Sequence, residues 1–273
     1  QVAGINFTLS TAVAYDANAE TYPASTYYGP KSINRVVINS INGKEFKADD
    51  TYAVVTNNFV AGGGDTYYAF AAASAQFDTG IPLDEAVMEY VTTELKGVIG
   101  AQYAAPQGRI LMNPFKDVKT SAWYGSYVID LYNDGIINGT SATTYAPNDT
   151  LTWAAALKLL LVSHGDLKAA DATGADWSKN TIAKAAELGL VAADLDGAKA
   201  ISRLEFCQVA AKLNKLAESK TESKFTDCTD GYVMALVDAK VISGMTETTF
   251  EPAASLTRAQ IAKILYQLTL IEK

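Results

Sequence analysis

Residues 225–265 read FTDCTDGYVMALVDAKVISGMTETTFEPAASLTRAQIAKIL, and residues 115–160 read FKDVKTSAWYGSYVIDLYNDGIINGTSATTYAPNDTLTWAAALKLL. Both stretches open with Phe-x-Asp and continue with an aromatic residue. In both, a proline follows a glycine by eight residues, and Leu-Thr follows that proline by four. A weaker copy lies between them, around Trp177 and Ile201–Glu205. A period of about 50 residues predicts supersecondary units that bury their apolar faces against one another.

Each unit has the pattern of two helices joined by a loop. In the first unit, apolar residues recur at helical spacing from Trp123 to Tyr132. Asp134-Gly135 is typical of a helix end, because glycine tolerates the left-handed backbone of a C-cap. After a turn-rich loop, Thr152 is expected to open the second helix.

The second helices of the later units begin with a distinct signal. Ser202-x-x-Glu205 and Thr257-x-x-Gln260 have the form of capping boxes, which predicts helix starts at these points. Arg203 and Arg258 then occupy the first helical position, where a cation opposes the helix dipole. Such a cation is tolerable when it meets an anion, so the pattern leaves two interpretations open, a salt bridge within the protein and an anionic ligand.

These combined motifs resemble the surface-layer homology (SLH) repeat. The resemblance covers residues 113–273 and implies three repeats, at 113–165, 166–217 (degenerate) and 218–273, that form an all-α assembly with pseudo-threefold symmetry. It implies that this module anchors its protein to secondary cell-wall polysaccharide, often pyruvylated, outside a bacterium in the cell wall or S-layer. A pyruvyl ketal carries a carboxylate, which suits the two arginines. The contacts that the resemblance implies fall on Arg203, Arg258, Asp117, Asp227, Gly139, Gly244 and Trp123.

The repeats depart from the family pattern in ways that matter. The first has Thr152-Trp153-Ala154-Ala155 where an arginine and a capping acid are expected, so its groove should bind an anionic sugar weakly. The second lacks the Phe-x-Asp opening. For Trp123, Trp177 and Tyr232, packing between units is favoured over stacking on a sugar.

The first 112 residues have a different pattern. Ile33–Ile41 alternates like a strand, Asn42-Gly43 is a hairpin signal, and Tyr52–Thr56 reads as a further strand. A loop with three successive glycines, Gly62 to Gly64, follows and can approach a ligand closely. Helices are expected at about 66–75 and 83–98, and a last strand at 109–111.

The motif Asn-x-Phe-x-Ala-Gly-Gly-Gly-Asp-x-Tyr, with Gln1-Val2-Ala3-Gly4 before it and Gly108-Arg109-Ile110 after it, resembles the C-terminal domain of 5′-nucleotidases. The resemblance covers residues 1–112, as the second half of that domain. In the family this domain holds the nucleoside, so the resemblance implies base stacking by Phe59, nucleoside binding by Asp65, and a backbone contact at Gly4. The alternatives are that Phe59 is a core residue and that Asp65 caps a helix starting at Thr66.

The sequence does not provide a catalytic site. Family catalysis uses two divalent metals in a separate N-terminal domain, whereas this chain has one histidine, His164, at a helix end. We expect no metal or cofactor in this chain, and nucleoside binding only together with a missing half-domain. The sequence therefore predicts a piece of a longer surface hydrolase that begins inside a domain.

Composition narrows the partners. A net charge of −8 and a pI near 4.8 without a basic cluster argue against nucleic-acid binding. No apolar run is long enough for a membrane span. Cys207 and Cys228 could form one disulfide, although two buried thiols are favoured.

The expected fold class is thus α+β: a truncated nucleotidase C-terminal α/β domain followed by three helical repeats. Its expected function is a wall anchor. Two alternatives stay open, an active nucleotidase or cyclic-nucleotide phosphodiesterase when joined to a metallophosphatase domain, and a structural S-layer subunit.

Overall fold

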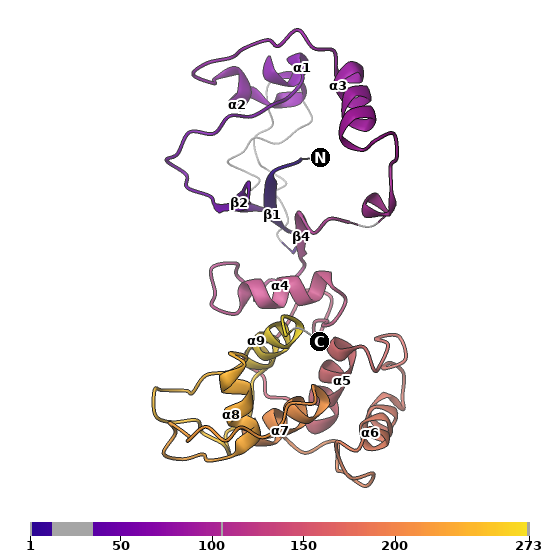
Figure 1. Ribbon diagram of the computed structural model, residues 1–273, viewed down its shortest axis with the longest axis vertical. Helices are drawn as coiled ribbons and strands as arrows, with labels where there is room; N and C mark the ends of the chain where they lie inside the picture. The colour runs from indigo at the N-terminus through magenta and orange to yellow at the C-terminus, as the bar shows by residue number, and fades with distance from the viewer. Residues whose placement is uncertain (1, 13–34, 105, 272–273) are drawn as a thin grey trace. The chain divides into compact units, whose positions relative to one another are not determined.

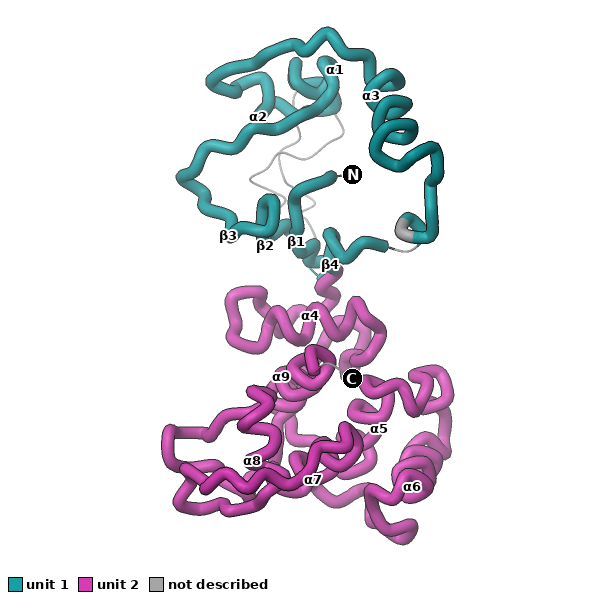
Figure 2. The backbone as a smooth tube through the Cα atoms, in the orientation of Figure 1, with its two compact units in different colours: residues 1–111 teal, residues 112–273 magenta. Residues whose placement is uncertain are grey.

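The computed structural model describes residues 2–12, 35–104 and 106–271. The chain divides into two compact units, residues 1–111 and 112–273 (Figure 2). Gln1 and Ile33, which the sequence interpretation also used, lie outside the described residues. In the part of the chain that the structure describes, no helix is long and apolar enough to span a membrane.

The first unit is built on a four-stranded sheet in the order β3-β2-β1-β4 (Figure 1). Strand β2 (Val36–Ile41) pairs antiparallel with both β1 (Ile5–Ser10) and β3 (Lys44–Glu45). Asn42 and Gly43 join β2 to β3 with φ of 50° and 74°, which is the backbone that a two-residue hairpin requires. The hairpin prediction is confirmed, and so is the last strand, observed as β4 (Ile110–Asn113).

The other predictions for this unit are confirmed less well. β1 was not predicted, and Tyr52–Thr56 is not a strand. The helix expected at 66–75 is reduced to α2 (Tyr68–Ala71), preceded by the single turn α1 (Asn58–Ala61). The next helix, α3 (Leu83–Glu89), continues through a π-helical turn to Glu94, close to its predicted span.

The described residues of the first unit form almost no core. Among them the buried side chain is that of Thr8, and many apolar side chains face solvent. Val55 is 97% exposed and Phe77 is 88% exposed. Exposure of this many large apolar side chains is unusual in a soluble protein, where exposed apolar surface often marks a place of interaction.

The second unit is helical, and each repeat supplies two helices. They are α4 (Gly125–Asn133), α5 (Trp153–His164), α6 (Trp177–Glu187), α7 (Arg203–Leu213), α8 (Gly231–Asp238) and α9 (Arg258–Thr269). The predicted helix starts are confirmed: Thr152 caps α5 through its side chain, and both capping boxes are formed.

The helices pack in a cyclic order. The first helix of a repeat lies against the second helix of the repeat before it, so α6 packs on α5 and α8 packs on α7. In the same way α4, from the first repeat, packs on α9, from the third (Figure 1).

Backbone hydrogen bonds at the helix starts follow a related cycle. In α5 the Trp153 N–H donates to Lys199 of the second repeat over 2.8 Å. In α7 the Arg203 N–H donates to Ala254 of the third repeat over 2.8 Å. The Arg258 N–H of α9 donates to Asp149 of the first repeat over 2.9 Å. Helix N–H groups that lack an intrahelical acceptor are thereby satisfied by a neighbouring repeat.

The centre of this arrangement is apolar. Leu151, Ile201 and Leu256, which each directly precede the helix cap of their repeat, are buried. Their backbones also pair, since the Ile201 N–H donates to Leu151 and the Leu151 N–H donates to Leu256. The Leu-Thr and Ile-Ser dipeptides of the repeat motif therefore join the three repeats as well as start their helices.

Candidate functional sites

Arg258 projects from the start of α9 into the loop of the first repeat. Its Nε donates to the Tyr145 carbonyl over 2.7 Å, and its Nη2 donates to the Asn138 carbonyl over 2.8 Å. The guanidinium lies over the Tyr145 ring, with 4.5 Å between Cζ and the ring centroid. The side chain is half-buried. These contacts fix a cation at the surface between the third and first repeats.

Arg203 makes the corresponding contacts with the third repeat, but it is more deeply placed. Its Nη2 donates to the Ser243 carbonyl over 2.8 Å, and the guanidinium lies 4.7 Å from the Phe250 ring centroid. Only 7% of this residue is exposed, and its buried Nε has no hydrogen-bond partner. Burial lowers the pKa of Arg203, and the nearby Cys207 and Glu251 oppose that effect.

In the first repeat, the first residue of the second helix is Trp153, at the position that Arg203 and Arg258 occupy in the other two repeats. It is buried and replaces the cation with an apolar side chain, as the sequence indicates. Among the described residues, neither arginine has a carboxylate within ion-pair distance. In the part of the chain that the structure describes, backbone carbonyls and aromatic rings take the place of the acid that the salt-bridge interpretation of Arg203 and Arg258 requires.

The aspartates of the two Phe-x-Asp motifs act on the same loops. Asp117 accepts hydrogen bonds from the Tyr145 and Ala146 N–H groups, over 2.9 and 2.7 Å. Asp227 does the same for Phe250 and Glu251, each over 2.8 Å. Each carboxylate thus holds the backbone of the loop that the arginine of a neighbouring repeat contacts. Contact of these aspartates with a polysaccharide stays a prediction.

Gly139 and Gly244 are required by close packing. A Cβ on Gly139 would collide with the Ser141 and Thr144 carbonyls and lie 2.6 Å from the Phe115 ring. Gly244 has equivalent neighbours in the third repeat. Packing alone therefore explains why glycine is needed at both positions. Their predicted contact with a ligand stays a prediction.

The sequence analysis missed Tyr145 and Phe250 as parts of these sites. Both rings underlie an arginine, and the Tyr145 hydroxyl also donates to the Arg258 carbonyl over 3.0 Å. Burial raises the pKa of Tyr145 to about 12, although Arg258 opposes this. The signal was present as the repeated aromatic-x-Pro motif, Tyr145 to Pro147 and Phe250 to Pro252.

The three aromatic residues near the start of each first helix differ in exposure. Trp123 is 58% exposed, so the preferred interpretation of it as packing between units is wrong. Trp177 and Tyr232 are half-buried. Each of those two carries an ammonium group on its ring, from Lys158 at 5.2 Å and Lys212 at 5.3 Å.

In the first unit, Phe59 and Asp65 lie in the same glycine-rich loop. Phe59 is 59% exposed and therefore not a core residue. A Cβ on Gly64 would lie 2.6 Å from the Phe59 ring, so the ring rests against the loop backbone. Asp65 is exposed within the turn Gly64–Thr66, with φ of 51°, and does not cap a helix. The two predicted nucleoside contacts are thus close in space.

Gly4 belongs to another part of the unit. It adopts φ of 73°, and its carbonyl accepts a hydrogen bond of 2.6 Å from the Asn42 N–H at the hairpin. Within the described residues, no hydrogen bond joins Gly4 to Phe59 or Asp65. The structure therefore gives Gly4 a role in the hairpin and does not bring it into the Phe59 loop.

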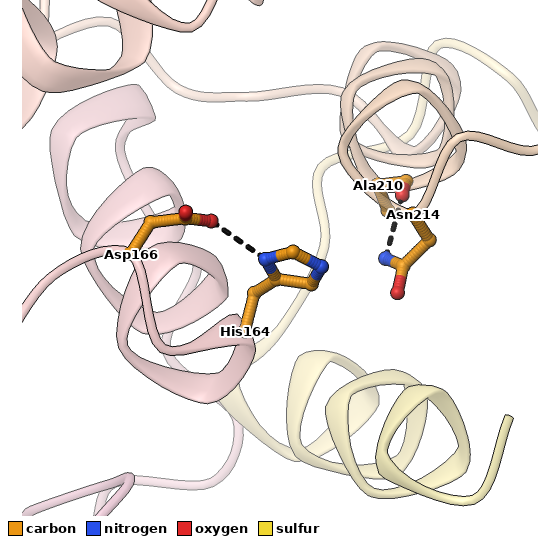
Figure 3. Close-up of polar contacts among 4 residues, drawn as sticks. All are labelled: His164, Asp166, Ala210 and Asn214. Carbon is orange, nitrogen blue, oxygen red and sulfur yellow. Dashed lines mark hydrogen bonds and ion pairs between the residues drawn. The ribbon is translucent and has the colours of Figure 1, made fainter. Parts of the chain in front are cut away.

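His164 is the last residue of α5, as its position in the sequence suggested. Its Nδ1 lies 2.6 Å from Asp166 Oδ2 (Figure 3). An open cavity of about 100 Å³ is lined by His164 and by Leu160, Ser163, Asn214, Leu268 and Thr269. Across the part of the chain that the structure describes, no three metal-ligating side chains cluster here or elsewhere.

Two known families match different parts of the chain. Residues 1–72 match the 5′-nucleotidase C-terminal domain, and residues 114–156 and 226–262 match the S-layer homology domain. The predicted architecture, a nucleotidase C-terminal segment followed by SLH domains, is confirmed. The matched ranges do not include the middle repeat, which the sequence shows to be degenerate.

Two relatives are similar to parts of the chain. An "Endoglucanase" of Bacillus sp. (strain KSM-635) is 29% identical over 179 residues, which is 57% of this chain and 18% of that protein. A "Surface-layer 125 kDa protein" of Lysinibacillus sphaericus is 40% identical over 84 residues, which is 28% of this chain and 7% of that protein. The chain thus spans less than a fifth of either relative.

Proposed function

We propose that residues 112–273 anchor a surface protein of a bacterium to an anionic cell-wall polysaccharide, with the three repeats acting as one pseudo-threefold unit. The SLH matches and the surface-layer relative support a location at the cell surface. The cyclic helix packing and the cyclic hydrogen bonds at the helix starts support the symmetry. The support for the location and the support for the symmetry both come from the repeats themselves and not from a bound ligand.

The observation that carries the proposal is the placement of Arg258. Its Nε and Nη2 are held by two carbonyls and its face is supported by Tyr145, so the guanidinium is oriented before any ligand arrives. A half-buried cation held in this way loses little side-chain entropy on binding. It can therefore receive the carboxylate of an acidic sugar, such as a pyruvyl ketal, through its remaining N–H groups.

Arg203 contributes less to recognition in this proposal. Its side chain is almost completely buried, so a ligand would reach it only after the third-repeat loop moved. We assign Arg203 mainly to holding the second and third repeats together. In this proposal Asp117 and Asp227 fix the backbone of the two loops that contact Arg258 and Arg203. Gly139 and Gly244 allow these loops to pack against the phenylalanines of their repeats.

The first unit is proposed to be part of a nucleoside-binding domain. Phe59 offers an exposed ring and Asp65 a carboxylate in the same loop, which suits a base and a nucleoside hydroxyl. The sparse core of this unit supports the view that nucleoside binding needs a further segment. Two divalent metals for hydrolysis would then belong to a separate catalytic domain of the parent protein.

The anchoring proposal is tested by binding of the chain to a purified bacterial wall polysaccharide that carries pyruvyl ketals. Mild acid hydrolysis, which cleaves ketals, provides the matched polysaccharide without pyruvyl groups. We expect binding that depends on the ketal and is lost in Arg258→Ala. We expect Arg203→Ala to lower the melting temperature. Absence of binding by the folded wild-type chain to either polysaccharide would overturn the proposal.

Two alternative functions can be tested by separate experiments. If the parent is an active nucleotidase, addition of a catalytic domain to this chain will give hydrolysis of 5′-AMP in the presence of divalent metal. If the chain is a structural S-layer subunit, it will assemble into ordered sheets without polysaccharide. The comparisons favour neither of these alternatives.

A further inference from the structure

The first helices of the three repeats differ at one equivalent position. Each of these helices ends in the same hydrogen-bond pattern, which allows their residues to be matched. The hydrogen bonds run from the N–H groups of Ile136, Leu190 and Val241 to the carbonyls of Leu131, Ala185 and Leu236. The residue directly before each of these carbonyls is therefore equivalent in the three repeats. It is Asp130 in α4, Lys184 in α6 and Ala235 in α8.

These three side chains are accommodated in different ways. Ala235, in the helix that packs on α7, is apolar and buried. Lys184 pairs with Glu187 of its own helix, with 3.0 Å between Nζ and Oε1. Asp130 is half-buried, and among the described residues its carboxylate has no hydrogen bond and no ion pair. A carboxylate that loses water without gaining a partner is unfavourable in its ionised form.

Asp130 belongs to the interface between α4 and α9, where the first repeat packs on the third. Tyr127, one turn before it, is in ring contact with Tyr266 of α9, with centroids 5.2 Å apart. Burial raises the pKa of Tyr266, and the charges of Asp130, Tyr127 and Asp134 raise it further. Lys263, one turn earlier in α9, forms no ion pair in the described part of the chain. The titratable neighbours of Asp130 are therefore two tyrosines and a second aspartate, and none of them supplies a positive charge.

We propose that Asp130 is an acid-sensitive element of this interface: its neutral carboxyl favours packing of α4 on α9, and its carboxylate loosens that packing. The loop that contacts Arg258 follows α4 in the same repeat, and Arg258 itself begins α9. Loosening of α4 from α9 thus also weakens the support of the guanidinium. The inference concerns how the ring of repeats closes, and it does not depend on what the chain binds.

The direction of the effect follows from the pKa of Asp130. Burial raises this pKa, and the like charge of Asp134 raises it further. The folded chain therefore keeps the proton at a pH where the unfolded chain, with an ordinary aspartate pKa of about 3.9, has lost it. The contribution of Asp130 to stability falls as the pH rises through this window, and the loss persists at neutral pH. Because Asp227 has a lowered pKa and acts in the opposite direction, variants must be compared at the same pH.

The proposal is tested by calorimetry of full-chain variants at pH 7 and near pH 3. Asp130→Asn removes the charge with little change of shape, so it should melt about 2 °C above the wild type at pH 7 and at the same temperature near pH 3. Asp130→Ala, which copies the third repeat, should lose stability relative to the wild type by a similar amount on acidification. Asp194→Asn makes the same change of net charge at an exposed residue, so it is the matched control and should melt like the wild type.

Two further measurements locate the effect at the interface. At pH 7 the backbone amides of α4 should exchange hydrogen more slowly in Asp130→Asn than in the wild type, while those of α6 should not change. Tyr266→Ala removes the ring that α9 places against α4, so Asp130→Asn should gain less in that background. No gain at pH 7, or an equal gain at both pH values, overturns the proposal. A full gain without the Tyr266 ring would assign the effect to the dipole of α4 itself and would also overturn it.

Discussion

The Asp227 carboxylate fixes the backbone of Glu251. Its Oδ2 accepts a hydrogen bond of 2.8 Å from the Glu251 N–H, and Glu251 has φ of 60°, in the left-handed region. Asp117 holds Ala146 in the same way in the first repeat, where φ is 57°. A left-handed non-glycine residue is unfavourable by itself, so the second residue of each aromatic-x-Pro motif depends on its aspartate.

This dependence predicts acid sensitivity. Hydrogen bonds from the Phe250 and Glu251 N–H groups lower the pKa of Asp227. The resulting stabilisation is complete above the ordinary aspartate pKa of about 3.9 and is lost as the pH falls through the lower folded value. We expect Asp227→Asn to melt at a lower temperature than the wild type at pH 7, with a smaller difference near pH 2. Calorimetry across this range checks it, and a difference independent of pH would contradict it.

Two glycines in one loop should respond differently to alanine. Gly139→Ala places a Cβ against carbonyl groups, so we expect a loss of about 3 kcal/mol in the free energy of unfolding, the upper end for overpacking. Gly135→Ala meets no atom within 4 Å and suffers only from its φ of 73°, so about 1 kcal/mol is expected. Urea unfolding measures both values. Equal losses would mean that the Gly139 loop can relax.

The capping box of α7 should show coupling between its two side chains. The Glu205 carboxylate accepts from the Ser202 N–H over 2.8 Å, and Ser202 Oγ accepts from the Glu205 N–H. We expect Ser202→Ala to lower the free energy of unfolding by about 1 kcal/mol. Because both changes disrupt one structure, Ser202→Ala and Glu205→Ala should not be additive in a double-mutant cycle. Thr152, which has Ala155 at the corresponding position, provides a cap without such a partner.

The two cysteines should be unreactive in the folded chain. Both are buried and unbonded, and burial raises the pKa of Cys207 to about 12 and also raises that of Cys228. Since the thiolate is the reactive form, Ellman's reagent at pH 8 should react only slowly with the native chain. After denaturation it should react rapidly with both thiols. Rapid reaction of one thiol without denaturant would show that its surroundings open. Absence of any reaction after denaturation would show a disulfide.

The repeats could be predicted in detail because local signals and tertiary packing agree there. Thr257 caps its helix, Gln260 completes the box, and Arg258 takes the first helical position, all as the sequence indicates. What the sequence could not provide was the partner of Arg258. Its carbonyl acceptors, Asn138 and Tyr145, lie more than a hundred residues away, and backbone carbonyls leave no mark in a motif.

The first unit was predicted less well for a related physical reason. Strand signals at Tyr52–Thr56 describe residues suited to a sheet, but a strand forms only where a neighbouring strand pairs with it. In the same unit β1 was missed although its residues, Ile5 to Ser10, alternate strictly between apolar and polar, so the signal for this strand was present in the sequence. The exposure of Trp123 was also misjudged, since helical spacing alone cannot tell a packed aromatic residue from a solvent-facing one.

The hydrogen bond from the Arg258 N–H to the Asp149 carbonyl has a consequence for how the proposed anchoring unit forms. A linear array of repeats can gain or lose a terminal copy and keep its remaining sites. Here the first repeat receives its arginine from the last, so synthesis must reach residue 258 before the Arg258 site exists. Attachment to the wall would then report that the whole helical unit is present, and a chain cut in its third repeat would be released and not held at the surface.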